Sequence, residues 1–225
     1  MSGRGFDAVI FDFDGVIADT EPLHHRAFCQ VVAEAGLACD WDTYCAEYIG
    51  FDDRDLFRAA YQRAGLPLDD TALRRCIAEK AAAFIALTQT GVPTYAGIPE
   101  VIQAMSKRWP LAICSGALRS DIDPILDQLN VQAAFTVRVT AEDVAASKPD
   151  PACYRLAVER VGEAMAEAPI PRRCLAIEDT PAGIAAATGA GLTVWGITHT
   201  HPAAALSQAD RVFDDLPALY SAAIA

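Results

Sequence analysis

The sequence predicts an α/β protein in which an all-helical domain interrupts a mostly parallel β-sheet core. Short runs of β-branched and aromatic residues alternate with helical stretches along most of the chain, as in proteins whose strands are joined through helices. Between about residues 21 and 90 the alternation stops, and only helical patterns occur. With 225 residues, of which 52% are hydrophobic, the chain can bury a sizeable core, so intrinsic disorder is excluded.

The expected elements of the core are bounded by turn-forming residues. Strands are expected at residues 8–13, 111–115, 135–139, 174–177 and 192–197. Helices are expected at residues 99–108, 121–129, 151–161 and 181–190, three of them with proline in the first turn, where its missing N–H costs nothing. Residues 1–18 and 92–225 would form the core and residues 19–91 the helical insertion, with hinges near Asp19 and at residues 91–97 (GVPTYAG).

Charge and cysteine content limit the partners and the compartment. The formal net charge of −12 would repel a phosphate backbone, so no nucleic acid partner is expected. The seven cysteines form no C-x-x-C pair and are odd in number, which favours reduced thiols and a cytoplasmic protein. No export signal is recognised, and glycines and prolines divide the uncharged stretch 180–209, so no membrane segment is expected. We expect a monomer or a weak dimer.

Two carboxylates mark the end of the first expected strand. Asp12 and Asp14 are two residues apart, and on a strand this spacing directs both side chains to one face. Two such carboxylates would repel each other unless a cation joined them. The alternative is a pair of acids that caps a turn, because Asp-Gly is a common turn signal.

The other candidate groups share a position, since each follows a core strand. They are Ser115 after the second strand, Lys148 in SKPDP after the third, and Glu178 with Asp179 in IEDTPAG at the end of the fourth. In open parallel sheets the ligand crevice lies beyond the carboxyl ends of the strands. All of these groups should therefore converge on one site.

Together the four motifs resemble those of the haloacid dehalogenase superfamily of phosphotransferases. They stand in the family's order as DFDGV from Asp12, ICSG, SKPDP and IEDTPAG, and the resemblance covers essentially the whole chain. The helical insertion resembles the family's type 1 cap domain, and DTEPLHHRAF resembles the β-phosphoglucomutase-like, CbbY-like subfamily. The resemblance implies a Rossmann-like parallel-sheet core with an inserted helical cap.

This resemblance also implies roles for the acidic residues. Asp12 would be the nucleophile that forms an aspartyl-phosphate, and Asp14 would protonate the leaving oxygen and then activate water. Mg²⁺ would be held by Asp12, the backbone carbonyl of Asp14, and the pair Glu178 and Asp179. Adjacent residues face opposite sides of an ideal strand, so one of this pair acts through water unless the chain bends. Of the two, Asp179 is the favoured metal ligand. The pair would also be compatible with capping the next helix.

Three further groups in the core motifs would bind the phosphoryl group. Ser115 would donate a hydrogen bond to its oxygens, together with backbone amides of the Gly116 turn. Lys148 would pair with both Asp12 and the phosphate, as a compact charge. The alternatives are that Ser115 caps the following helix and that Lys148 is a solvated surface lysine.

In the helical insertion, two residues match positions where the subfamily often keeps a histidine and a lysine that reach over the crevice. His24 would steer a proton at the leaving group, and Lys80 would bind a second anionic group of the substrate. Arg54, in GFDDRDLF, lies within a residue or so of the subfamily's phosphate-binding arginine. A surface histidine and solvated basic side chains are the alternatives. His199 and His201 suggest zinc, but no third ligand stands at a suitable spacing, so a loop is favoured.

The leading functional prediction is a Mg²⁺-dependent phosphatase that acts on a small phosphorylated metabolite, such as a sugar or polyol phosphate. A β-phosphoglucomutase-like phosphomutase is the second possibility. The subfamily's mutases place polar residues just after the loop serine, whereas this chain has Ala117 and Leu118, although Arg119 would partly compensate. A 2-haloacid dehalogenase is the remote alternative, because dehalogenases of this superfamily lack the second aspartate.

Overall fold

The core of the protein is a six-stranded sheet whose strand pairs are all parallel, in the order β3-β2-β1-β4-β5-β6. A computed structural model describes residues 5–89 and 91–225, so parts of the expected domain segments, residues 1–4 and 90, lie outside the described chain. The strands are β1 (Ala8–Phe11), β2 (Leu111–Cys114), β3 (Phe135–Val139), β4 (Cys174–Glu178), β5 (Thr193–Ile197) and β6 (Arg211–Phe213). The predicted α/β class with a parallel sheet is confirmed.

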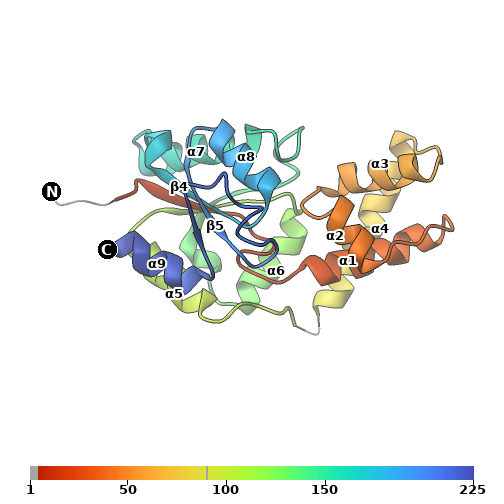
Figure 1. Ribbon diagram of the computed structural model, residues 1–225, viewed down its shortest axis with the longest axis horizontal. Helices are drawn as coiled ribbons and strands as arrows, with labels where there is room; N and C mark the ends of the chain where they lie inside the picture. Colours follow the sequence, from red (N-terminus) through yellow and green to blue (C-terminus); the bar gives the residue numbers. More distant parts are fainter. Residues whose placement is uncertain (1–4, 90) are drawn as a thin grey trace.

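Helices cover both faces of this sheet, while a separate helical group lies beyond one end of it (Figure 1). The core helices are α5 (Ile98–Ser106), α6 (Arg119–Gln128), α7 (Ala152–Met165), α8 (Pro181–Gly189) and α9 (Leu216–Ile224). One face packs against α5, α6 and α9, and the other against α7 and α8. Alternate residues of β1 serve the two faces, since Val9 and Phe11 join one apolar cluster while Ala8 and Ile10 join the other.

The remaining helices form the insertion: α1 (Glu21–Ala33), α2 (Trp41–Glu47), α3 (Asp53–Arg63) and α4 (Asp70–Thr88). They pack around an apolar cluster of their own, which includes Phe28, Tyr48 and Phe57. Three of these helices begin at an aspartate, Asp40, Asp52 or Asp69, whose carboxylate accepts a hydrogen bond from the backbone N–H of the third residue that follows. We call this four-helix group the cap. Among the described residues, no helix is long and apolar enough to cross a membrane.

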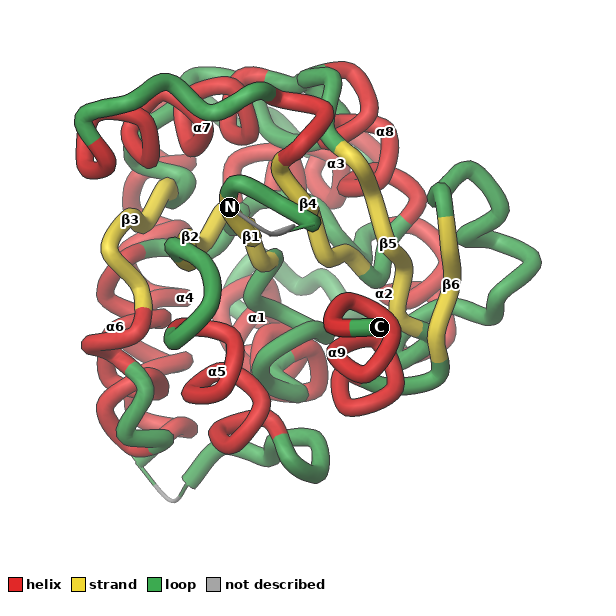
Figure 2. Tube along the Cα trace, turned by 90° about the vertical axis from the view of Figure 1, so that its left-hand side faces the viewer, coloured by secondary structure: helices red, strands yellow, loops and turns green. Residues whose placement is uncertain are grey.

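The core differs from the expected one in the end of its first strand and in two added elements. The first strand ends at Phe11 rather than at residue 13, and a sixth strand and the helix α9 follow the last predicted strand. β6 has only three residues and lies at the edge of the sheet (Figure 2), so its sequence is too short to carry an alternating pattern. The end of β1 changes the argument for the two aspartates, because both lie in the loop that follows.

Two chain segments join the cap to the core, and they lie side by side. Ala18 forms a bridge with Asp14 in the first segment and with Thr94 in the second. The backbone N–H of Asp19 also donates a hydrogen bond to the carbonyl of Pro93, at 2.9 Å. The two crossings therefore form one short ladder between cap and core.

Candidate active site

The site lies beyond the carboxyl ends of β1, β2 and β4. At this point the strand order reverses, because β2 and β3 lie on one side of β1 and β4 to β6 lie on the other. Asp12 follows β1, and its backbone N–H still donates to the carbonyl of Ile177, which ties the loop to β4 at 2.9 Å. Gly15, at φ +75°, turns the chain back so that Asp14 also faces the crevice. The two aspartates thus share one cavity, but a turn brings them together rather than the pleat of a strand.

Lys148 is the cation at the bottom of this crevice. Its Nζ lies 2.8 Å from Asp12 Oδ1 and 2.7 Å from Glu178 Oε1, and it donates to the carbonyl of Cys114 at 3.0 Å. Burial would lower the pKa of Lys148, but the two carboxylates raise it well above its ordinary value, so the ammonium stays charged. The side chain is 8% exposed, so the surface-lysine alternative is wrong.

Glu178 is completely buried at the end of β4 and is held from several sides. Besides Lys148, Tyr154 of α7 donates to Glu178 Oε1 at 2.6 Å. Gly183 of α8 lies directly against the carboxylate, and a Cβ atom there would collide with all three atoms of the carboxyl group. Neither Tyr154 nor Gly183 has a sequence signature that connects it to Glu178, although Gly183 is the last residue of IEDTPAG.

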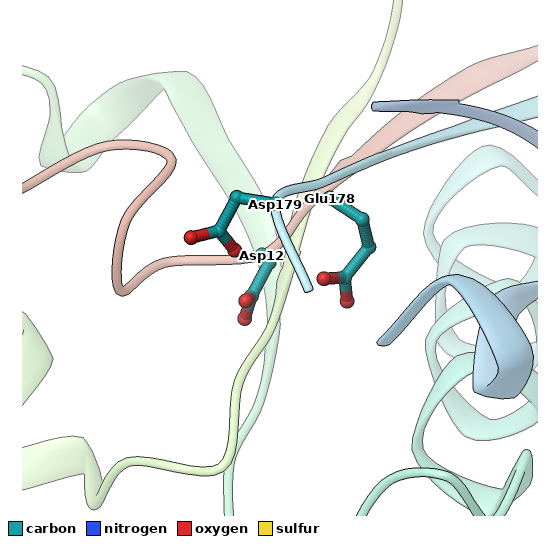
Figure 3. Close-up of side chains that lie close together, drawn as sticks. All are labelled: Asp12, Glu178 and Asp179. Atoms are coloured by element: carbon teal, nitrogen blue, oxygen red, sulfur yellow. The ribbon is translucent and has the colours of Figure 1, made fainter. Parts of the chain in front are cut away.

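Asp12, Glu178 and Asp179 form the one described group that fits a metal ion, since one oxygen from each lies within 4.8 Å of the others (Figure 3). All three are buried, and Asp179 Oδ1 has no hydrogen-bond partner among the described residues. Burial raises the pKa of Asp12, and Glu178 adds to the rise while Lys148 opposes it. Burial likewise raises the pKa of Asp179, with Asp12 and Glu178 adding to it. The donor set therefore fits a hard divalent cation that prefers oxygen.

The loop from His199 to His201 supports Asp179 and the turn at Gly15. Thr200 donates to Asp179 Oδ2, while His201 Nδ1 contacts the carbonyl of Asp179 at 3.1 Å. His199 Nδ1 lies 2.8 Å from the carbonyl of Gly15 and must donate there, because a carbonyl only accepts. Burial lowers the pKa of His199, which favours the neutral ring. The two histidines are therefore part of a loop, the alternative that the sequence favoured over a zinc site. They support the backbone at Gly15 and Asp179.

Asp14 is the aspartate that faces the cap. Thr20 donates to its Oδ1 at 2.5 Å, Ser115 donates to its Oδ2 at 3.2 Å, and His24 Nε2 lies 3.3 Å from Oδ1. Burial would raise the pKa of Asp14, but these hydrogen bonds outweigh it and hold the pKa below its ordinary value. In this arrangement Asp14 is a carboxylate, the form of a general base.

Ser115 and Gly116 form the turn after β2. The backbone N–H of Ala117 donates to Ser115 Oγ at 2.9 Å, which orients the hydroxyl toward Asp14. The helix α6 begins only at Arg119 and has no side-chain cap, so the helix-cap alternative for Ser115 is wrong. Gly116 lines the cavity. Its missing side chain leaves the backbone accessible there.

His24 and Lys80 reach the site from two helices of the cap. Both are buried, so the surface alternatives for these residues are wrong. Lys80 Nζ lies 3.0 Å from His24 Nδ1 and also forms an ion pair with Asp53. Because an ammonium only donates, Nδ1 accepts and His24 carries its proton on Nε2, which then donates to Asp14.

Two arginines considered from the sequence lie outside the residues that line the cavity. Arg54 pairs with Asp52 at 2.5 Å and donates to the carbonyl of Val144 at 3.1 Å, so it links α3 to the loop before Lys148. Arg119 donates to the carbonyl of Arg138 and lies 3.6 Å from Asp143. The structure does not bring either guanidinium together with Asp12.

A cavity of about 50 Å³ remains between core and cap, which is room for only a few water molecules. At its inner side lie Asp12 and Lys148. At its outer side lie five acidic or basic residues that we call the cap end: Glu21, His24, Asp53, Lys80 and, from the first turn of α6, Asp121. The sequence offers no signal for Glu21, Asp53 or Asp121, because acidic residues early in a helix are common for electrostatic reasons alone.

Known proteins match this chain over the region that contains the four motifs. The family model of haloacid dehalogenase-like hydrolases matches residues 6–191. The chain is 28% identical to validoxylamine A 7'-phosphate phosphatase of Streptomyces hygroscopicus subsp. limoneus, over 94% of each chain. It is 28% identical to the fructose-1-phosphate phosphatase YqaB of Escherichia coli, over 83% of this chain and 94% of that protein.

Among solved structures, CbbY from Rhodobacter sphaeroides in complex with xylulose-(1,5)bisphosphate superposes with a TM-score of 0.82 and 25% identity, covering 94% of this chain and 95% of that chain. The predictions of the superfamily, of the CbbY-like group and of a phosphatase are confirmed by these relatives. With its model spanning most of the sequence, the chain belongs to the haloacid dehalogenase-like hydrolase family.

Proposed function

We propose that the protein is a Mg²⁺-dependent phosphatase that hydrolyses a small sugar or polyol phosphate through an aspartyl-phosphate on Asp12. One observation carries this proposal: Asp12 and Asp14 face the same cavity in different electrostatic settings. Asp12 lies between Lys148 and the acidic group, while Asp14 is held by three hydrogen bonds. Two carboxylates with separated roles are what a double displacement at phosphorus requires.

In the first step, an Asp12 carboxylate oxygen forms a bond to phosphorus as the ester oxygen leaves. Lys148 reduces the repulsion between Asp12 and the anionic phosphate, and Ser115 with the Gly116 amide binds the phosphoryl oxygens. The leaving alkoxide takes a proton from Asp14, which must first be protonated. Asp14 takes up this proton from solvent water, and His24 orients the Asp14 carboxyl toward the leaving oxygen through its Nε2–H.

In the second step, Asp14 removes a proton from water, and the resulting hydroxide attacks the phosphorus of the aspartyl-phosphate. The bond between Asp12 and phosphorus breaks, so inorganic phosphate is released and the Asp12 carboxylate returns. The hydrogen bond from Thr20 keeps Asp14 ionised for this step, while the Ser115 hydroxyl donates to the phosphoryl group.

Mg²⁺ would be held by Asp12, Asp179 and the backbone carbonyl of Asp14, with Glu178 acting through water, and when bound it would neutralise negative charge on the phosphoryl group. The unpartnered Asp179 Oδ1 supports a direct ligand there. Glu178 Oε1 is already engaged by Lys148 and Tyr154, which supports the indirect role.

The residues after Ser115 favour hydrolysis over a phosphomutase reaction. A phosphomutase must hold a bisphosphate intermediate while it turns around, and that needs a second site for an anion. Ala117 is apolar, and Arg119 is bound to Arg138 and Asp143 outside the cavity, which supports transfer to water. The sugar phosphates named for the relatives support the substrate class, and we retain the cytoplasm as the compartment because the odd number of cysteines favours it.

The test is a panel of sugar and polyol phosphates assayed for phosphate release with Mg²⁺, beside isomerisation of β-glucose 1-phosphate. Activity should vanish with EDTA, return with Mg²⁺ and be inhibited by excess Ca²⁺, whose larger coordination shell misplaces the nucleophile. Full activity in chelator would refute the metal-dependent mechanism. If β-glucose 1-phosphate becomes the 6-phosphate faster than phosphate is released, and a bisphosphate primer is needed, the enzyme is a mutase.

A further inference from the structure

The cap end of the cavity holds three carboxylates that the proposed reaction does not use. Glu21 belongs to α1, Asp53 to α3 and Asp121 to α6, so they approach from three different helices. All three line the cavity. Asp121 is only 4% exposed, although no basic side chain in the described part of the chain is paired with it.

The positive charges around the cavity are already engaged. Lys80 forms an ion pair with Asp53 and donates to His24, which in turn contacts Asp14. Lys148 is shared by Asp12 and Glu178. Within residues 5–89 and 91–225, these two lysines line the cavity and no arginine does. A second anionic group of a substrate would therefore meet carboxylates at the cap end without a free cation.

Two of the three carboxylates still have free capacity to accept hydrogen bonds. Among the described residues, the Asp121 carboxylate accepts only from Ser120, at a long 3.3 Å. Glu21 accepts from the hydroxyl of Tyr44 at 3.0 Å. An ionised carboxylate has about four acceptor positions, so both groups suit a ligand rich in donors. Lys80, expected from the sequence to bind a second anion, instead has its charge compensated by Asp53.

We infer that the substrate is a monophosphate whose leaving group donates hydrogen bonds and carries no negative charge, and that Asp121 is a specificity-determining residue which rejects a second phosphate or carboxylate. This inference rests on the proposed phosphatase function and narrows its substrate class. Burial raises the pKa of Asp121 to about 6, with His24 and Lys80 opposing the rise and Asp53 and Asp14 adding to it. The group is therefore mostly ionised at pH 7.5, where it repels an anion and accepts from hydroxyl or ammonium groups.

The test compares substrates that differ only in the second anion, with the Mg²⁺-loaded enzyme at pH 7.5. Fructose 1-phosphate is paired with fructose 1,6-bisphosphate, and glucitol 6-phosphate with 6-phosphogluconate, which is also an open chain. In each pair we expect kcat/KM to be at least tenfold higher for the compound without the second anion. Equal or higher kcat/KM for the doubly anionic partners would overturn the inference while leaving the phosphatase function intact.

Two variants connect this selectivity to one residue. Asp121→Asn keeps the shape and removes the charge, so the ratio of kcat/KM for fructose 1,6-bisphosphate over fructose 1-phosphate should rise at least threefold. Asp127→Asn makes the same change on the exposed face of the same helix and should leave the ratio unchanged. An unchanged ratio in Asp121→Asn would contradict the assignment of Asp121.

A binding measurement keeps the inference independent of turnover. Calorimetric titration of the Asp12→Asn variant with the same pair should give at least tenfold tighter binding of fructose 1-phosphate. If no compound, including p-nitrophenyl phosphate, releases phosphate with Mg²⁺, the proposed function fails, and the titration still decides whether the cavity rejects the second anion. Tighter binding of the bisphosphate would refute the inference.

Discussion

The two ends of the cavity are built in different ways. At the core end, Asp12, Lys148 and Glu178 stand in or next to loops at strand ends, and the one cation is shared by two carboxylates. At the cap end, the functional groups project from helices, and the lysine there is paired with a cap carboxylate. In the proposed reaction, the core end would hold one phosphoryl group, whereas the cap end would select what is attached to it.

The position of each group depends on different forces at the two ends. Parallel strand pairing aligns the loops after β1, β2 and β4, so the core end follows from the sheet. At the cap end, Lys80 meets His24 only because α1 and α4 pack together with the correct rotation. Substitutions at the core end should therefore affect every substrate, and those at the cap end should affect some more than others.

The largest effect is expected at the core end, for Asp12→Asn. The amide has the shape of the carboxylate but is a poor nucleophile, so kcat should fall by about four orders of magnitude for all substrates. Circular dichroism and the melting temperature should show that the fold is kept. Activity within tenfold of the wild type would rule out the covalent mechanism.

A matched pair of glycine substitutions in α8 tests how tightly the core end is packed. Gly183→Ala places a methyl group into the Glu178 carboxylate, whereas at Gly189 the added carbon would lie 3.4 Å from Pro151, an ordinary contact. We expect Gly183→Ala to lose about a hundredfold in kcat and to melt at lower temperature, because Glu178 must leave Lys148. Gly189→Ala serves as the control in the same helix. Equal kinetics and melting for both variants would contradict this geometry.

Asp121→Asn should stabilise the protein at the cost of selectivity. On folding the pKa of Asp121 rises from 3.8 to about 6, so the folded state binds more protons between these values and the free energy of unfolding falls as pH rises through them. With roughly 1.4 kcal/mol for each pKa unit, removing the carboxylate should add about 2 to 3 kcal/mol at pH 8 and nothing below about pH 4. Urea unfolding at both pH values measures this, with Asp127→Asn as the control. A gain that is the same at both values would exclude the carboxylate as its cause.

At the cap end, His24→Ala should separate substrates. The ring contacts Asp14 and the region of the leaving group, so kcat/KM should fall about tenfold further for a sugar phosphate than for p-nitrophenyl phosphate, which lacks most of these contacts. His25→Ala is the control on the same helix, because His25 contacts Cys39 within the cap. An equal fall of kcat/KM for both substrates would show that His24 affects every substrate alike, as the core-end residues are expected to do.

The smallest expected effect is a change in the radius of gyration as the cap moves against the core. The cavity has room for only a few waters, so we expect substrate to enter through a more open form, with hinges near Asp19 and at residues 91–97. Solution scattering should show a larger radius of gyration without ligand than with Mg²⁺ and BeF₃⁻. An identical scattering curve in both states would contradict a mobile cap.

The core end was predictable because its signals are local. Asp12, Lys148 and Asp179 stand in short motifs that follow apolar runs, and the strand order brings such positions together. The expectation that strand pleating directs Asp12 and Asp14 to one face was nevertheless wrong. β1 ends before both residues, and the turn at Gly15 directs Asp14 into the same cavity as Asp12. Tyr154 could not be found, because it lies 24 residues before Glu178 and only the packing of α7 on the sheet brings the two side chains together.

By itself the sequence determined the fold class, the helical insertion and the residues of the four motifs, because hydrophobic periodicity and turn chemistry act over a few neighbouring residues. Only the tertiary structure decided which charges compensate one another. It directed Arg54 toward Asp52 and left Asp53 at the cavity, where it pairs with Lys80. That choice depends on the rotation of α3 against the core, and a shift of one residue turns a helix face by about 100°. Such a rotation is set by the packing of many side chains at once, which no short motif records.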